Sequence, residues 1–80
     1  MTVGEAVQLR ILELCRERDL SINKLSTLSG VTQSTVNNIV SGRNNSVTVS
    51  TIKKICDGLD ITIQDFFDSA LFIGLEQELR

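Results

Sequence analysis

Residues 33–41 combine three amide side chains with several hydroxyls and carry no charge. The amides are Gln33, Asn37 and Asn38, and Ser34 lies beside Gln33. A carboxamide presents a donor and an acceptor together, which matches N6 and N7 of adenine in the major groove of duplex DNA. A plain solvated helix face is the alternative interpretation, although such faces are usually rich in Lys and Glu. These four residues are therefore candidates for base contact.

Two short apolar stripes would position this polar cluster. Apolar residues recur at helical spacing on both sides of Gly30, at Leu25, Leu28, Val31, Val36, Ile39 and Val40. The stripes can bury each other if the chain reverses at Gly30, since glycine adopts the positive φ of a tight turn at little cost. Positions 33, 34, 37, 38 and 41 then face outward. This pattern is typical of a helix-turn-helix.

The composition predicts one compact all-α domain. The 80 residues are 41% apolar, with no proline and three aromatic residues. Ser21 and Thr62 suit N-cap positions, and helices are expected to begin after Ser21, after Thr32, at Thr48 and after Thr62. We expect five helices, over 4–18, 22–29, 33–41 and 48–59, with a short last one after Thr62 that points Phe66 and Phe67 at the core. Val49 is expected on the inward stripe of the fourth helix. Short strands at 47–49 and 61–63 are the alternative.

Other kinds of chemistry find little support in the sequence. The chain has no histidine, and Cys15 and Cys56 form no C-x-x-C pair, so we expect no metal site and two reduced core thiols. Without histidine or a glycine-rich phosphate loop, we expect no enzyme and no cofactor. No run approaches the roughly 20 apolar residues of a membrane span, and the start lacks a basic signal-peptide region. We therefore expect a cytoplasmic protein with no membrane partner and no small-molecule ligand.

The charges are segregated along the chain, although the net charge is −2. Residues 20–56 contain no acidic residue, and they carry Lys24, Arg43, Lys53 and Lys54. Residues 57–79 contain six acidic residues and no basic one. Because DNA responds to the local field of the face that it meets, a mildly acidic protein can still dock through a positive face. Chance segregation of surface charge is the alternative.

Several short motifs in this sequence occur together in one known family. They are Leu20-Ser21, Leu25-Ser26, Ser29-Gly30-Val31-Thr32, Ser41-Gly42-Arg43 and Ile61-Thr62-Ile63-Gln64-Asp65-Phe66-Phe67. Together they resemble the phage-repressor helix-turn-helix family, the Cro and Xre type, over residues 7–67. The resemblance implies a compact five-helix bundle whose third helix enters the major groove, with two copies reading a pseudo-palindromic operator. Gln33 falls on the position that resembles the family's principal base-reading glutamine.

Residues around the third helix are expected to contact the DNA backbone. The first turn of the second helix presents backbone amides and the positive end of the helix dipole, at Asn23 and Lys24. Many relatives have glutamine where this chain has Ile22, so one side-chain phosphate contact is lost there. The full expected set is Asn23, Lys24, Thr35, Ser41, Arg43, Asn44 and Asn45. Thr35 could instead meet a thymine methyl, Asn37 could reach only the backbone, and Lys53 and Lys54 fit a solvated surface equally well.

Residues 69–80 form a second expected unit, beside a DNA-binding domain at 4–68. Apolar residues at Leu71, Phe72, Leu75 and Leu79 predict a C-terminal helix despite Gly74. We expect these four side chains to form a homodimer contact, with Leu9 and Leu12 of the first helix as the facing row. A tail folded onto its own domain is the alternative.

The sequence thus predicts a DNA-binding transcriptional regulator, a repressor in its simplest form, that binds double-stranded DNA as a homodimer. A second hypothesis is a protein-interaction module with the same fold, such as an antirepressor or a partner subunit. The positive, acid-free stretch around the third helix favours DNA.

Overall fold

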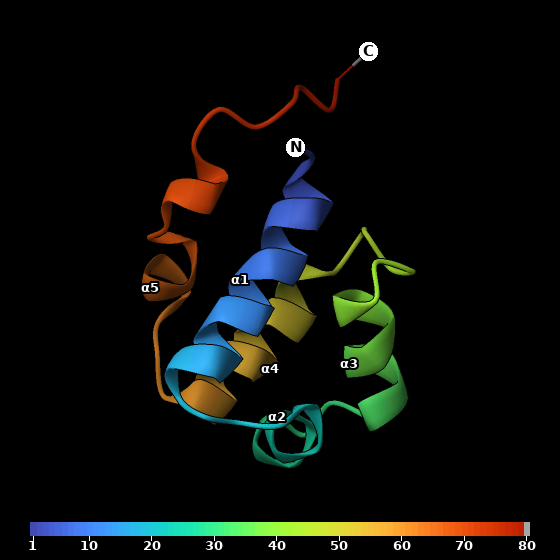
Figure 1. Ribbon diagram of the computed structural model, residues 1–80, viewed down its shortest axis with the longest axis vertical. Helices are drawn as coiled ribbons and strands as arrows, with labels where there is room; N and C mark the ends of the chain where they lie inside the picture. Colours follow the sequence, from blue (N-terminus) through green and yellow to red (C-terminus); the bar gives the residue numbers. More distant parts are fainter. Residues whose placement is uncertain (80) are drawn as a thin grey trace.

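The chain folds into helices joined by short turns (Figure 1). The computed structural model describes residues 1–79, which contain five α-helices, one 3-10 helix and no strand. The elements are α1 (Val3–Glu17), α2 (Ile22–Ser29), α3 (Gln33–Val40), α4 (Val49–Leu59), α5 (Ile63–Phe67) and η1 (Ala70–Phe72). The predicted all-α, five-helix class is confirmed, and the alternative strands at 47–49 and 61–63 are not formed. Across the described part of the chain, no helix is both long and apolar enough to cross a membrane.

A hydroxyl side chain caps the start of every α-helix. The caps are Thr2, Ser21, Thr32, Thr48 and Thr62, and each hydroxyl accepts the N–H three residues further along. Such a cap satisfies one of the amides that a helix start leaves without a partner. In α1 the Thr2 N–H also donates to the Glu5 carboxylate, which lowers the pKa of Glu5. The predicted caps Ser21 and Thr62 are confirmed, and the structure adds Thr32 and Thr48 as caps. Thr48 therefore precedes α4, which was expected to begin at that residue, and Thr2 places the start of α1 one residue earlier than expected.

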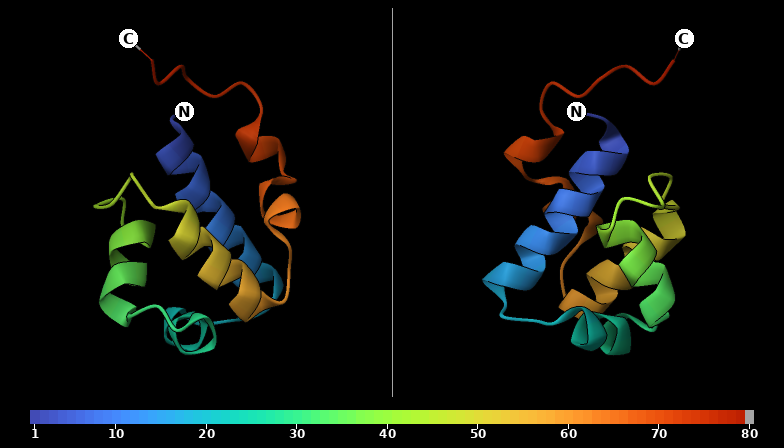
Figure 2. Two further views of the ribbon diagram at one scale, coloured as in Figure 1. Left: turned by 180° about the vertical axis from the view of Figure 1, so that it is seen from behind. Right: turned by 45° about the vertical axis from the view of Figure 1, so that its right-hand side comes forward.

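The helices α1 and α4 form the centre of the molecule (Figures 1 and 2). The helix α3 covers one side of this pair, α5 and η1 cover the other, and α2 crosses one end. Gly58 brings α4 very close to α2, since a Cβ at Gly58 would lie 2.8 Å from the backbone of Leu28 and Ser29. Each α-helix contributes buried apolar side chains, of which Phe66 is the largest that is fully buried. Both cysteines are free and buried, and burial raises the pKa of each thiol.

Three apolar residues that were expected inward lie at the surface. Val49 is 70% exposed because it is the first residue of α4, beside the cap and before the packed part of the helix. Phe67 is exposed because consecutive helical positions point about 100° apart, and Phe66 already faces the core. Leu28 is 43% exposed, and Leu25 is the buried residue of α2.

The predicted C-terminal helix is wrong. Only Ala70–Phe72 forms a 3-10 turn, which begins where the Ser69 hydroxyl accepts the Leu71 N–H. Gly74 then has a φ of +71°, and residues 75–79 are not helical. A single left-handed residue ends a right-handed helix, so the apolar spacing could not by itself impose one. Arg80 lies outside the described residues.

A buried arginine ties α1 to the end of α5. Arg10 donates from Nε to the Phe66 carbonyl at 2.7 Å and from Nη2 to the Asp65 carbonyl at 2.8 Å, and it also pairs with Glu13. These carbonyls belong to the last turn of α5, where a helix leaves its acceptors without internal partners. Arg10 therefore acts as a C-terminal cap supplied by another helix.

Candidate nucleic-acid interface

The turn between α2 and α3 is fixed by bonds from both sides. Gly30 has the predicted positive φ, +69°, and donates its N–H to the Ser26 carbonyl at 3.0 Å. The Ser26 hydroxyl donates to the Val31 carbonyl across the same turn. Thr32 then begins α3 by accepting the Thr35 N–H at 3.2 Å. The angle between the two helices is thus set by backbone bonds and by buried side chains such as Val31.

The outer face of α3 is polar and uncharged. Gln33, Ser34 and Asn37 are exposed, whereas Asn38 is half-buried beside the buried Ile39. The hydroxyl of Thr35 is 2.8 Å from that of Thr32, so it is engaged within the protein. The structure therefore brings three of the four expected base-contact side chains onto one open face, and Asn38 lies at its edge.

The segment after α3 is a folded loop. Ser41 follows α3, and Gly42 has the positive φ expected of a C′ residue, +82°. Asn44 donates its N–H to the Asn38 carbonyl at 2.9 Å, and its side-chain oxygen accepts the Ser46 N–H at 3.0 Å. Arg43 and Asn45 are exposed. The loop can thus present a guanidinium and an amide to a phosphate, while the side chain of Asn44 mainly shapes the loop.

The first turn of α2 is the other expected phosphate site. Asn23 and Lys24 are both exposed there. The Lys24 N–H is taken by the Ser21 hydroxyl at 3.1 Å, so the amides that remain for an anion are the two before it. Together with the loop after α3, this turn lies within the acid-free part of the chain, residues 20–56.

The segregation of charge along the chain is in part also a segregation in space. The helix α5 and the residues directly after it, which carry Asp65 and Asp68, lie on the far side of the α1/α4 pair from α3 (Figure 2). The last segment, which carries Glu76 and Glu78, runs back over the start of α1 (Figure 2). Lys53 pairs with Asp57 on the surface of α4, and this contact raises the pKa of Lys53. Lys53 is therefore a compensated surface charge, and Lys24, Arg43 and Lys54 carry the positive character of the acid-free part.

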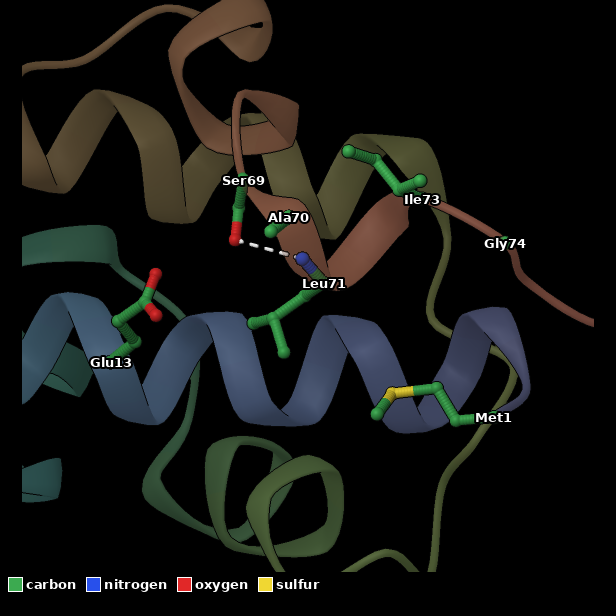
Figure 3. A pocket seen from close by; sticks show the side chains of 7 residues that line it. All are labelled: Met1, Glu13, Ser69, Ala70, Leu71, Ile73 and Gly74. Atoms are coloured by element: carbon green, nitrogen blue, oxygen red, sulfur yellow. Dashed lines mark hydrogen bonds between the residues drawn. The ribbon is translucent and has the colours of Figure 1, made fainter.

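The expected dimer residues are divided between two environments. Phe72 packs onto its own core, with ring centroids 6.2 Å from Phe66 and 4.8 Å from Phe67. Leu71 and Leu75 are half-buried, and Leu79 is exposed. A shallow hollow of about 450 Å³ lies between residues 69–74 and α1 (Figure 3). It is lined by Met1, Glu13, Ser69, Ala70, Leu71, Ile73 and Gly74.

The sequence analysis missed two residues of α1 that contact the end of α3 and the loop after it. Gln8 donates from Nε2 to the carbonyl of Val40 at 2.8 Å, at the end of α3. Gly4 touches Asn45, because a Cβ there would lie 2.3 Å from the Asn45 carbonyl oxygen. The available signal was a glycine at the first position of the predicted first helix, where a residue of higher helix propensity would be expected.

The fold and this face define a helix-turn-helix DNA-binding domain, a class of transcription regulators and not of enzymes. The chain belongs to the family of Cro/C1-type HTH DNA-binding domains, whose model matches residues 10–69. The predicted membership of the phage-repressor group is thus confirmed.

Two of the proteins that this chain is similar to are prophage proteins. Over 64 residues it is 30% identical to the SPbeta prophage-derived uncharacterized HTH-type transcriptional regulator YopS of Bacillus subtilis (strain 168), covering 80% of this chain and 86% of that protein. The crystal structure of the prophage Lp1 protein 11 superposes with a TM-score of 0.76 at 42% identity, covering 88% of this chain and 93% of that one. This chain is therefore similar to prophage proteins along most of its length.

Proposed function

We propose that this protein is a repressor that binds a pseudo-palindromic operator as a homodimer, with α3 in the major groove. The observation that carries the proposal is the open, uncharged amide face of α3, held by a turn that is bonded on both sides. Such a face favours readout of base edges over general attraction to phosphate. The protein would act in the cytoplasm, and no small-molecule ligand is invoked.

Base and backbone contacts fall to different residues in this proposal. Gln33 at the start of α3 pairs with an adenine, with Ser34 and Asn37 beside it and Asn38 at the edge of the groove. The phosphate contacts are assigned to Asn23, Lys24, Thr35, Ser41, Arg43, Asn44 and Asn45. Among these, Arg43 provides an exposed side-chain charge next to α3.

The dimer contact is proposed for the C-terminal unit, residues 69–80, which joins the DNA-binding unit, residues 4–68. Ile73 and Leu79 are 79% and 80% exposed, and Leu9 on α1 is also exposed. The half-buried residues Leu71, Phe72 and Leu75 would lie beneath these exposed side chains, between the dimer contact and their own domain. Light scattering on a chain that ends at Ser69 tests this assignment. A monomer supports it, and a dimer assigns the contact to another surface.

Selection of duplexes from a random pool at moderate salt tests the function. A palindrome with half-sites about one helical turn apart is expected. Gln33→Ala should relax the preference at one base pair, with a loss of about 1–3 kcal/mol of discrimination. Arg43→Ala should weaken binding to every sequence alike and reduce the salt dependence. No enrichment by the unmodified chain would contradict the proposal and favour a protein-interaction module.

A further inference from the structure

The carbonyls at the end of α3 are all occupied. A helix leaves its last four carbonyls without internal partners, and in α3 these belong to residues 37–40. Three of these carbonyls accept the backbone N–H groups of Ser41, Gly42 and Asn44 in the following loop, at 2.9, 3.1 and 2.9 Å. The fourth, the Val40 carbonyl, accepts the side chain of Gln8 at 2.8 Å. One donor that completes the end of α3 thus comes from α1.

The same face of α1 also holds the loop itself. Gly4 and Gln8 are four residues apart on a helix, so they lie on one face. Gly4 is buried, and a Cβ there would lie 2.3 Å from the Asn45 carbonyl oxygen and 2.8 Å from the Asn45 Cβ. A Cβ at Gly42 would lie 3.4 Å from the side-chain oxygen of Gln8. The loop thus contacts α1 at two points, on either side of Arg43.

We propose that Gly4 and Gln8 are positioning residues for DNA binding, which hold the loop at residues 41–46 in register with α3. This inference rests on the proposed function and deepens it. Arg43 and Asn45 gain affinity only if they meet phosphates while Gln33 meets its base. A loop fixed before binding does not have to be ordered by the DNA, so less of the interaction energy is lost.

Two substitutions release the loop in different ways. Gln8→Met keeps the length of the side chain and removes the donor to the Val40 carbonyl. Gly4→Ala displaces Asn45 while making α1 a better helix, because alanine has a higher helix propensity than glycine. If one variant fails to fold, which circular dichroism shows, the other still carries the test.

The first measurement uses the free protein and no DNA. The amide of Asn44, which bonds to the Asn38 carbonyl, should exchange with solvent about tenfold faster in both variants. The amide of Ile55, in the centre of α4, should keep its rate. Unchanged exchange at Asn44 would overturn the part of the proposal that concerns the loop.

The second measurement is the affinity for the selected duplex. Both variants should bind about tenfold more weakly. In a double-mutant cycle, Gln8→Met should cost little once Arg43→Ala is present, because the loop then has less to position. A loss of the same size on both backgrounds would show a general structural role and overturn the proposal.

Two control variants separate this effect from lost stability. Gln64→Met makes the same chemical change on α5, on the far side of the molecule, and should leave affinity unchanged. Thr62→Ala removes the cap of α5 and should lower the melting temperature without lowering affinity at a temperature where it is folded. If the unmodified chain binds no duplex, the proposed function has failed, and the exchange rates still decide whether α1 holds the loop.

Discussion

The segment that we propose contacts DNA, residues 33–46, and the C-terminal segment, residues 69–79, both lie at the surface but are held in different ways. In the first, a hydroxyl caps the start of α3 and four donors complete its end. In the second, within the part of the chain that the structure describes, residues 75–79 make one backbone bond to the rest, from the Glu76 N–H to the Met1 carbonyl at 3.0 Å. Local stability follows such differences in burial and bonding. We therefore expect residues 33–46 to have higher local stability than residues 75–79.

The largest test of this contrast is one matched pair of isoleucines. Ile39 on α3 is fully buried, and Ile73 is 79% exposed. Ile39→Ala should lower the free energy of unfolding by about 2–5 kcal/mol, because it leaves a cavity. Ile73→Ala should change it by less than about 0.5 kcal/mol at protein concentrations where the chain is a monomer. Urea unfolding followed by circular dichroism measures both. A loss for Ile73→Ala that grows with protein concentration is expected from the proposed dimer, whereas a large loss in the monomer would contradict the contrast.

A second pair sharpens the contrast through the backbone. Gly30 and Gly74 have φ values of +69° and +71°, and an added Cβ would meet no atom within 4 Å at either one. At Gly30 the bonded turn cannot relax, so Gly30→Ala should cost about 1 kcal/mol from the strain of a left-handed residue. Gly74→Ala should cost less in thermal unfolding, because the segment after it can adjust. Equal losses would mean that the tail is held as firmly as the turn.

A last effect is expected from pH, and it belongs to the central helices and not to either surface segment. Burial raises the pKa of Cys15 and Cys56 above the ordinary 9.0. Their contribution to stability is therefore fully present below the ordinary pKa and is lost as the pH rises through the raised one. The free energy of unfolding should be lower at about pH 10 than at about pH 8. This range stays below the ordinary pKa of lysine. The fall should be smaller in the Cys15→Ala/Cys56→Ala variant, and an equal fall would assign it to other groups.

Signals that are local in the sequence predicted the motif well. Ser21, Thr32, Thr48 and Thr62 cap helices because a hydroxyl acts on amides three residues away, and Gly30 turns the chain within its own neighbourhood. The outer face of α3 followed from its period alone. These features need no knowledge of what packs against them.

Contacts between distant residues could not be predicted in the same way. Gln8 and Val40 are 32 positions apart, and Arg10 and Phe66 are 56 apart, so no spacing in the sequence links them. Arg10 did give a hint, because it shares a helix face with Val7 and Leu14. The C-terminal helix was predicted wrongly because the apolar spacing of this segment suits a helix, whereas Gly74 has a left-handed conformation. Which residues contact DNA remains a prediction.

Gly58 lets the backbone of α2 pack directly against α4. The position of the helix-turn-helix on the rest of the fold therefore does not depend on any outward side chain of α3. The residues that hold the motif and the residues that it displays are therefore different ones. A library randomised at Gln33, Ser34 and Asn37 should stay folded in nearly all its members. If these residues read bases as proposed, the preferred duplex can change through substitutions that leave the core packing intact, and related proteins can differ in target while they keep one fold.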